Sequence, residues 1–155
     1  MTERHAILLN EIRYAERLCL RTARLYRRAG AVCAFMAAVG GSAALGALLP
    51  QLPAAISLAG AVLMAVFGAA ALVVRPADKA AANEADAKRY ARLRTEAHGM
   101  DEGALQSALD KVRETDVPEI EPLRDVAWND LVREIGCPQD AVPLRWQQRM
   151  LAAIA

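Results

Sequence analysis

The hydrophobic positions of this chain are concentrated in one long central segment, with segments of helical periodicity on either side. No Asp, Glu, Lys, Arg or His occurs among the 46 residues from Ala29 to Val74. This stretch is much longer than a buried helix of a soluble protein, whereas a bilayer core about 30 Å thick needs roughly 20 apolar residues per helix. The central segment therefore predicts two membrane crossings.

Two prolines divide the central segment. Pro50 and Pro53 each lack an amide donor and restrict the residue before them, so both stop a helix. The flanking runs, about 30–49 and 54–74, are each long enough to span about 30 Å as helices. We expect an all-α membrane protein with three parts: an amphipathic helix over residues 1–28, a transmembrane hairpin over 29–75 and a helical region over 76–155.

Basic residues near the ends of the two runs predict their orientation. Arg27 and Arg28 precede the first run, Arg75 and Lys79 follow the second, and the turn between Pro50 and Pro53 has no basic residue. Because positively charged flanks stay in the cytoplasm, we expect both termini on the cytoplasmic side and the turn outside.

Small residues recur at four-residue spacing in both runs. Such rows let helix backbones approach closely, and in lipid this packing replaces the hydrophobic drive. Two helices have too little mutual surface to use every row, so we expect homo-oligomerisation as well as packing within the hairpin. A pore is compatible with runs that lack ionisable groups, because apolar constrictions gate by dewetting. The candidates for helix packing or pore lining are Ser42, Gly46, Ser57, Gly60 and Gly68.

The first 28 residues carry an arginine face. They contain seven Arg against three Glu and neither Gly nor Pro, so a continuous amphipathic helix is expected. Three roles for this face are open: contact with lipid headgroups, pairing with an acidic helix of the same chain, and nucleic-acid binding. No nucleic acid is expected, because the membrane is the nearer polyanion. The candidates for headgroup or partner contact are Arg17, Arg21, Arg24 and Arg28.

The segment after the second run has helical signals separated by turn residues. We expect helices over about 78–98, over 102–114, over 123–135 and from near Pro143 to 154. Asp78 is the expected cap of the first and Gly99 its stop, and residues 117–122 should be extended between two prolines. Residues 75–155 carry 12 basic and 15 acidic side chains, so they should pack on the basic N-terminal helix, mainly through apolar stripes.

The sequence has no constellation of catalytic or metal-binding residues. It has no Gly-rich phosphate loop, no H-E-x-x-H and no C-x-x-C. We therefore expect no enzymatic activity, no cofactor and no metal. An acidic cluster lacks the loop pattern of a cation site and is expected to be a solvated face; its members are Asp110, Glu114, Asp116, Glu119 and Glu121.

Three kinds of bulky or reactive side chain, Trp, Cys and His, are expected to have structural roles. Trp128 and Trp146 should anchor helix packing, and Cys19 should be buried. His5 and His98 lie in separate predicted helices, which indicates surface or capping roles.

The arrangement resembles the SLATT family, bacterial two-transmembrane effector domains associated with nucleotide-sensing conflict systems. The resemblance covers about Arg13 to Arg94: the Arg-rich first helix, the uncharged pair of crossings, and the return helix with Arg75 and Tyr90-Ala-Arg-Leu-Arg94. It implies an oligomeric effector of the bacterial inner membrane that perturbs the bilayer when a cytoplasmic sensor triggers it during phage infection.

Three functions follow as hypotheses. The first is a membrane effector that permeabilises the bilayer. The second is a membrane-anchored scaffold that recruits a cytoplasmic partner through its helical tail. The third is a phage-encoded exclusion or holin-like factor. In each, the lipid bilayer is the primary partner.

Overall fold

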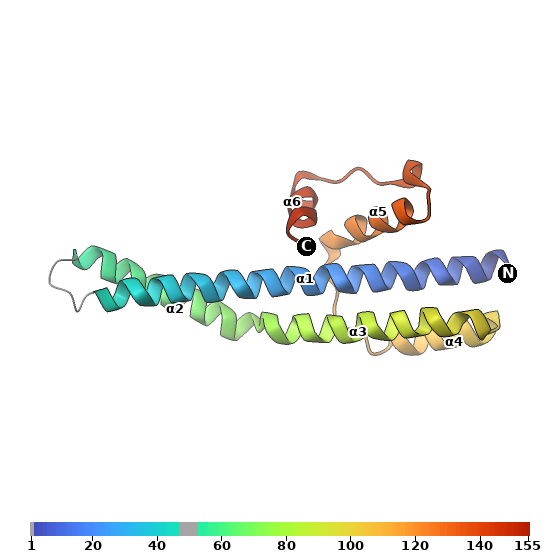
Figure 1. The fold of residues 1–155 in the computed structure, drawn as a ribbon, viewed down its shortest axis with the longest axis horizontal. Helices are drawn as coiled ribbons and strands as arrows, with labels where there is room; N and C mark the ends of the chain where they lie inside the picture. Colours follow the sequence, from blue (N-terminus) through green and yellow to red (C-terminus); the bar gives the residue numbers. More distant parts are fainter. Residues whose placement is uncertain (1, 47–52) are drawn as a thin grey trace. The chain divides into compact units, whose positions relative to one another are not determined.

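The computed structural model of the chain describes residues 2–46 and 53–155 (Figure 1). Every regular element in this part of the chain is helical, which confirms the all-α prediction. The elements, in order, are α1 (Glu3–Leu45), α2 (Ala54–Val74), α3 (Pro76–Glu96), η2 (Ala97–Gly99), α4 (Glu102–Arg113), η3 (Glu121–Leu123), α5 (Arg124–Glu134), η4 (Pro138–Asp140) and α6 (Trp146–Ile154).

The chain forms two compact units. The first, which we call the head, comprises α1 up to Leu25 together with Ala80–Ala155; the second, the apolar unit, comprises Tyr26–Lys79. This division differs from the three predicted parts, because α1 contributes to both units. The reason lies in its sequence, which has no Gly or Pro before Gly30 and therefore nothing to end the helix between the arginine face and the uncharged run.

Two helical stretches, Glu3–Leu45 and Ala54–Gly99, are long and apolar enough to cross a membrane. In their most apolar windows only 6% and 11% of the residues are buried. Side chains such as Phe35, Leu58 and Leu72 are instead exposed. A soluble core helix would bury these residues, so the outward apolar surface favours a lipid environment. The part of the predicted turn that includes Pro50 lies outside the described residues, while Pro53 directly precedes α2.

The junction between α2 and α3 is one residue long. Arg75, with φ 49° and ψ 55°, has the left-handed backbone conformation that ends α2, and its amide still donates to the carbonyl of Ala71. Pro76 then occupies the first position of α3, where its missing amide is no loss. The expected cap at Asp78 is therefore wrong: its carboxylate lies in the first turn, 2.6 Å from the guanidinium of Arg75.

The helices of the tail follow the predicted order with shifted ends. Asp101 caps α4, because its Oδ1 accepts from the amide of Ala104 at 2.7 Å. Gly136, with φ 80°, follows α5 in the left-handed conformation that favours glycine. The last helix starts at Trp146 rather than near Pro143. Buried Asn129 holds the backbone of Val142 extended through two hydrogen bonds of 2.8 Å each.

The head has two hydrophobic clusters, both of which include α1. One joins Leu8, Ile12 and Cys19 of α1 to Tyr90 of α3 and Leu105 of α4. The other joins Leu18 to Leu123, Val126 and Ala127, with Leu25 and Leu151 packed at its edge. The predicted packing of the tail on the N-terminal helix is confirmed. Each fully buried Leu contributes about 1.5–3 kcal/mol, more than an exposed ion pair at about 0–1 kcal/mol.

Candidate functional site

The apolar unit contains a close crossing of α1 and α2 at two glycines. A methyl group on Gly40 would lie 2.6 Å from the carbonyl oxygen of Gly60 and 2.6 Å from the amide nitrogen of Met64. A methyl group on Gly60 would lie 2.6 Å from Cβ of Ala43. No larger residue fits at either position without displacing a backbone. Further along α1, Gly30 faces Pro76, the first residue of α3.

The structure distributes the five predicted small residues over different environments. Gly60 lies in the crossing. Ser57 and Gly46 are buried, and the hydroxyl of Ser57 has no hydrogen-bond partner among the described residues. Ser42 is exposed, and its hydroxyl donates to the carbonyl of Ala38 at 2.9 Å, so it is satisfied within its own helix. The five residues therefore do not form one surface.

Gly68 lies on an open side of α2. No atom of the described residues, other than its immediate neighbours, lies within 4 Å of a Cβ added there. Ala65 and Ala69, beside it, are exposed. We call Ala65, Gly68 and Ala69 the open small-residue face. Small residues gain packing energy in lipid only when a second helix approaches them closely. This face has the character of a helix-docking surface that the α1–α2 pair does not use.

Gly40 was missed by the sequence reasoning, although it lies in the close crossing with Gly60. Counting four-residue rows selected Ser42 and Gly46 on α1 instead. The Gly40-Gly41 pair was the available signal, because adjacent glycines in an apolar helix are a weakness unless a backbone approaches closely.

Two of the four candidate arginines are paired within the head. Arg17 Nη2 lies 2.5 Å from Glu134 Oε2, and Arg21 Nη2 lies 2.8 Å from Asp130 Oδ2. Arg21 Nη1 also donates to the carbonyl of Ala152 at 3.1 Å, so this side chain joins α1 to α5 and α6. These two arginines are thus paired with carboxylates of α5 in the same chain.

The other two arginines are exposed. Arg24 lines a small depression of the head together with Arg17, Arg21 and Arg133. Two carboxylates also line the depression, so four guanidinium groups face two acids there. Arg28 belongs to the apolar unit. Contact of Arg24 and Arg28 with headgroups or a partner stays a prediction.

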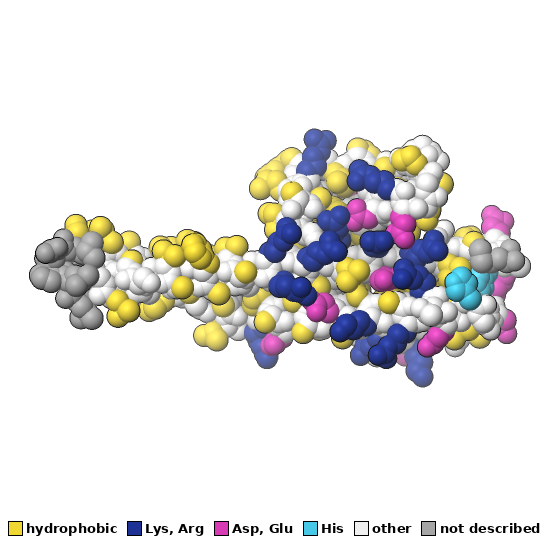
Figure 2. Space-filling view, in the orientation of Figure 1, with side chains coloured by type: hydrophobic (Ala, Val, Ile, Leu, Met, Phe, Trp, Pro, Cys, Tyr) yellow, Lys and Arg dark blue, Asp and Glu magenta, His cyan; other side chains and the backbone are white. Residues whose placement is uncertain are grey.

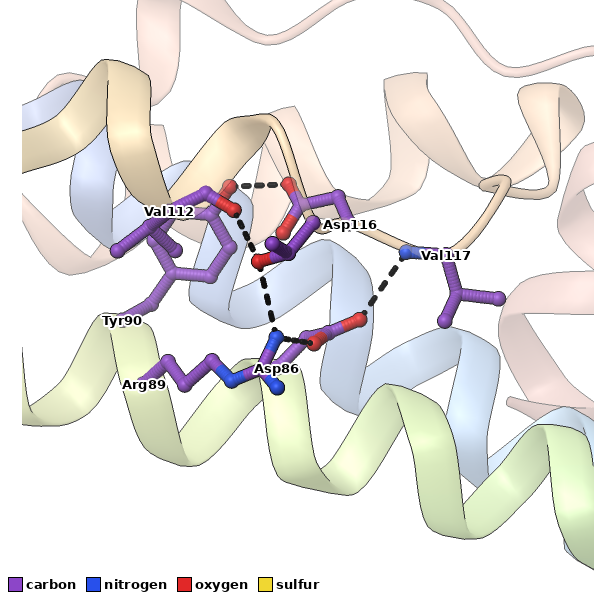
Figure 3. Close-up of polar contacts among 7 residues, drawn as sticks. Asp86, Arg89, Tyr90, Val112, Asp116 and Val117 are labelled. Atoms are coloured by element: carbon purple, nitrogen blue, oxygen red, sulfur yellow. Dashed lines mark hydrogen bonds and ion pairs between the residues drawn. The ribbon is translucent and has the colours of Figure 1, made fainter.

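A buried polar cluster connects α3 to the segment after α4 (Figure 3). Asp86 is 3% exposed, accepts from Arg89 Nη1 at 2.9 Å and accepts from the amide of Val117 at 3.1 Å. Arg89 also donates to the hydroxyl of Thr115 at 3.0 Å. A buried carboxylate is tolerated only with such partners. The Asp86 cluster therefore fixes the course of the chain between α4 and α5.

Tyr90 and Asp116 extend this cluster. The Tyr90 hydroxyl donates to Asp116 Oδ2, as Figure 3 shows. Burial raises the pKa of Asp116, the hydrogen bond from Tyr90 lowers it, and the charges of Asp86 and Glu119 raise it further. Burial is also the main cause that raises the pKa of the Tyr90 hydroxyl. The expectation of a wholly solvated acidic face is wrong for Asp116, because Tyr90 reaches it from the core.

The two tryptophans differ in environment. The Trp128 indole donates to the carbonyl of Asp140 at 3.1 Å and packs edge-on against Tyr14, with ring centroids 6.3 Å apart. Trp146 is 69% exposed, so its predicted role as a packing anchor is wrong. The α6 face that carries it points away from the core formed with Leu151 and Ala152.

The cysteines are free thiols, and Cys19 is buried as predicted. Burial, reinforced by the nearby carboxylates of Asp116 and Asp86, raises the pKa of Cys19 to about 12. Across residues 2–46 and 53–155, no three His, Cys, Asp or Glu side chains are grouped to hold a metal ion.

No family model, no curated protein and no solved structure matches this chain.

Proposed function

We propose that this protein is an oligomeric effector of the bacterial inner membrane that perturbs or permeabilises the bilayer when triggered, in antiphage defence. Both termini lie in the cytoplasm, and α1 and α2 form a transmembrane hairpin. The observation that carries the proposal is the open small-residue face of Ala65, Gly68 and Ala69 on α2, which the α1–α2 pair leaves exposed.

The crossing at Gly40 and Gly60 already joins α1 and α2. The open small-residue face is therefore available to a helix of another chain. Helices associate in lipid by close backbone packing, since the lipid tails remove any hydrophobic advantage of burying Leu or Val. This supports self-association of chains through α2. Several hairpins together supply enough helices to surround a pore, which one pair of helices does not.

Permeabilisation by such an assembly needs no ionisable lining. The apolar runs are uncharged, and the hydroxyl of Ser42 is satisfied by its own helix. A path lined by small and apolar side chains opens and closes by wetting and dewetting rather than by titration. The helix α1 belongs to both units, so a sensor that binds the head acts on the same helix that crosses the bilayer.

The test compares Gly68→Leu with Val66→Leu. A Leu at position 68 fills the open small-residue face without touching the Gly40 crossing, whereas Val66 is 57% exposed and, two positions before Gly68, projects to nearly the opposite side of α2 from that residue. We expect Gly68→Leu to lower the oligomer mass measured by light scattering in detergent and to abolish ion flux in cells. Val66→Leu should change neither. An unaltered oligomer in Gly68→Leu, or a monomeric wild-type protein with no ion flux at high expression, would contradict the proposal.

A membrane-anchored scaffold is the second candidate. The observation that favours it is the head, which has its own hydrophobic clusters and a depression where Arg24 and Arg133 are exposed. An acidic soluble partner would complement this depression. Recovery of a stoichiometric partner with the detergent-solubilised wild-type protein, and its loss in Arg24→Gln/Arg133→Gln, would support the scaffold; recovery of the bare homo-oligomer would exclude it.

A further inference from the structure

The last helix of the head presents an exposed apolar stripe. Trp146, Met150 and Ile154 are 69%, 55% and 42% exposed, and their four-residue spacing places them on one side of α6. The opposite side, with Leu151 and Ala152, packs into the head. Figure 2 shows hydrophobic side chains gathered over this part of the head beside Lys and Arg side chains. We call the three exposed residues the α6 stripe.

The residues beside the α6 stripe are basic. Arg145 and Arg149 lie one turn apart along the edge of the stripe, and both are exposed. The segment from Ala141 to Ala155 has no Asp or Glu. The backbone amide of Arg145 donates to Gln148 Oε1, and Arg149 Nε donates to the carbonyl of Leu144. Neither acceptor is a carboxylate, so neither bond neutralises the charge of an arginine. A helix that exposes Trp and Met on one side, with arginines beside them, is typical of helices that lie in a membrane interface.

The α6 helix is attached to a part of α1 close in sequence to the uncharged run. Arg21 donates to the carbonyl of Ala152, and Leu25 packs against the same cluster as Leu151. Leu25 precedes Ala29, the first residue of the uncharged run, by four positions within the same helix. A helix that is tethered to a membrane-spanning helix meets the bilayer at high effective concentration, so a small apolar contact suffices to dock it.

We propose that the α6 stripe docks on the anionic surface of the bilayer, with Trp146 and Met150 at the headgroup level and Arg145 and Arg149 on anionic headgroups. A second copy of the chain fits the stripe less well. Three side chains on a nine-residue helix are far fewer than the roughly 20–30 residues per side of a stable protein interface. Two neighbouring arginines would also oppose each other across a symmetric contact.

The test uses the full chain in nanodiscs whose lipids carry brominated acyl chains, which quench tryptophan at short range. In a Trp128→Phe background Trp146 is the sole tryptophan. We expect its emission to be quenched and shifted to shorter wavelength in discs with phosphatidylglycerol, and less so in discs of phosphatidylcholine alone. Absence of quenching in the anionic discs, or equal quenching in both lipids, overturns the proposal.

Matched variants separate docking from general proximity to lipid. Trp146→Phe keeps only Trp128, whose indole is bonded to Asp140, and its emission should not respond to brominated lipid. Equal quenching of Trp128 would overturn the proposal. Arg145→Gln/Arg149→Gln should lower the ratio of docked to undocked chains by about fivefold per arginine. Arg133→Gln, which removes an exposed arginine from α5, should leave the ratio unchanged.

Two further outcomes keep this proposal distinct from the effector function. Co-elution of the chain with the disc establishes insertion, so an unquenched Trp146 in inserted protein rejects docking of α6 and leaves oligomerisation through α2 untouched. Efficient disulfide cross-linking between two chains through Trp146→Cys, together with an unquenched Trp146 in the Trp128→Phe protein, would assign the stripe to a second copy and overturn the proposal.

Discussion

At the scale of single residues, Gly40 is a position that tolerates no added side chain. Its α-carbon faces the backbone of Gly60 and Met64, so even a methyl group must displace one helix from the other. Gly68 is the natural comparison, because the same residue type occupies an open side of α2 there. Two glycines in one unit thus have opposite sensitivity to an added side chain.

We expect Gly40→Ala to destabilise the apolar unit and Gly68→Ala to leave it unchanged or slightly stabilised. Overpacking costs about 1–3 kcal/mol, which exceeds the gain of about 1 kcal/mol that Ala gives in a helix interior. Unfolding by sodium dodecyl sulfate in mixed micelles measures the difference. Equal stability of the two variants would show that the Gly40 crossing does not hold the pair together.

Asp116 gives the head a pH dependence. Burial raises its pKa above the ordinary value of 3.8, so the folded chain retains this proton to a higher pH than the unfolded chain does. Its contribution to stability is therefore fully present below pH 3.8 and is lost as the pH rises through the raised pKa.

The variant Asp116→Asn should remove this part of the pH profile. The Asn carbonyl still accepts from the Tyr90 hydroxyl, so the cluster keeps its geometry without the titration. Urea unfolding of the detergent-solubilised protein, followed by tryptophan emission from pH 3 upward, measures it. Glu121→Gln, at an exposed site five positions after Asp116, is the control and should retain the wild-type slope of stability against pH. A slope that persists in Asp116→Asn would assign the titration to another group.

At the scale of elements, Arg21 of α1 joins three helices of the head. Its guanidinium bonds the side chain of Asp130 in α5 and the carbonyl of Ala152 in α6, and it is only partly exposed. Arg24, one turn further along α1, lines the same depression and is exposed. The pair offers a matched comparison of an arginine that joins elements with one that does not.

We expect Arg21→Gln to loosen α5 and α6 from α1, with a loss of about 1.5–3 kcal/mol from hydrogen bonds to a charged group. Hydrogen exchange followed by mass spectrometry should show faster exchange in Arg124–Glu134 and Trp146–Ile154 while α4 keeps its protection. Arg24→Gln should leave the exchange of all three helices as in the wild type. Uniformly faster exchange across the head would indicate global destabilisation instead.

At the scale of the whole molecule, the proposed sidedness can be read from the cysteines. Cys137, in the turn after α5, is half-buried and reachable, while Cys19 is buried and its pKa is raised to about 12, so its thiol stays protonated and unreactive near neutral pH. Cys137 therefore reports on the side of the membrane where the head lies.

We expect a membrane-impermeant maleimide to leave the protein unlabelled in intact spheroplasts and to label Cys137 after permeabilisation. Cys137→Ser should lose that signal. A variant with Cys137→Ser and Gln51→Cys, placed in the segment predicted to face outside, should react in intact spheroplasts. Labelling of Cys137 from outside would reverse the assigned orientation.

Features of the sequence that depend on neighbouring residues alone were predictable. The helical class and the existence of two apolar helices follow from the uncharged stretch between Ala29 and Val74 and from Pro53, which precedes α2. Helix α4 was predicted almost to the residue, because Asp101 caps it through a local bond. A predicted helix boundary was wrong where residues distant in sequence determine it. The start of α6, for example, is set by the hydrogen bonds between Asn129 and Val142.

Only the tertiary structure decided which side chains meet. Four-residue spacing identified small residues, but it selected Ser42 and passed over Gly40, because the crossing point depends on the path of both helices. The same holds for Arg21, whose partners lie more than a hundred positions away, and for Trp146, whose exposure depends on which side of α6 the core occupies. The sequence alone thus determined the elements and which helices are long and apolar enough to cross a membrane, since hydropathy and helix breaking are local properties. Which helix surfaces contact one another could be read only from the tertiary structure, since contacts between distant residues depend on how whole helices pack.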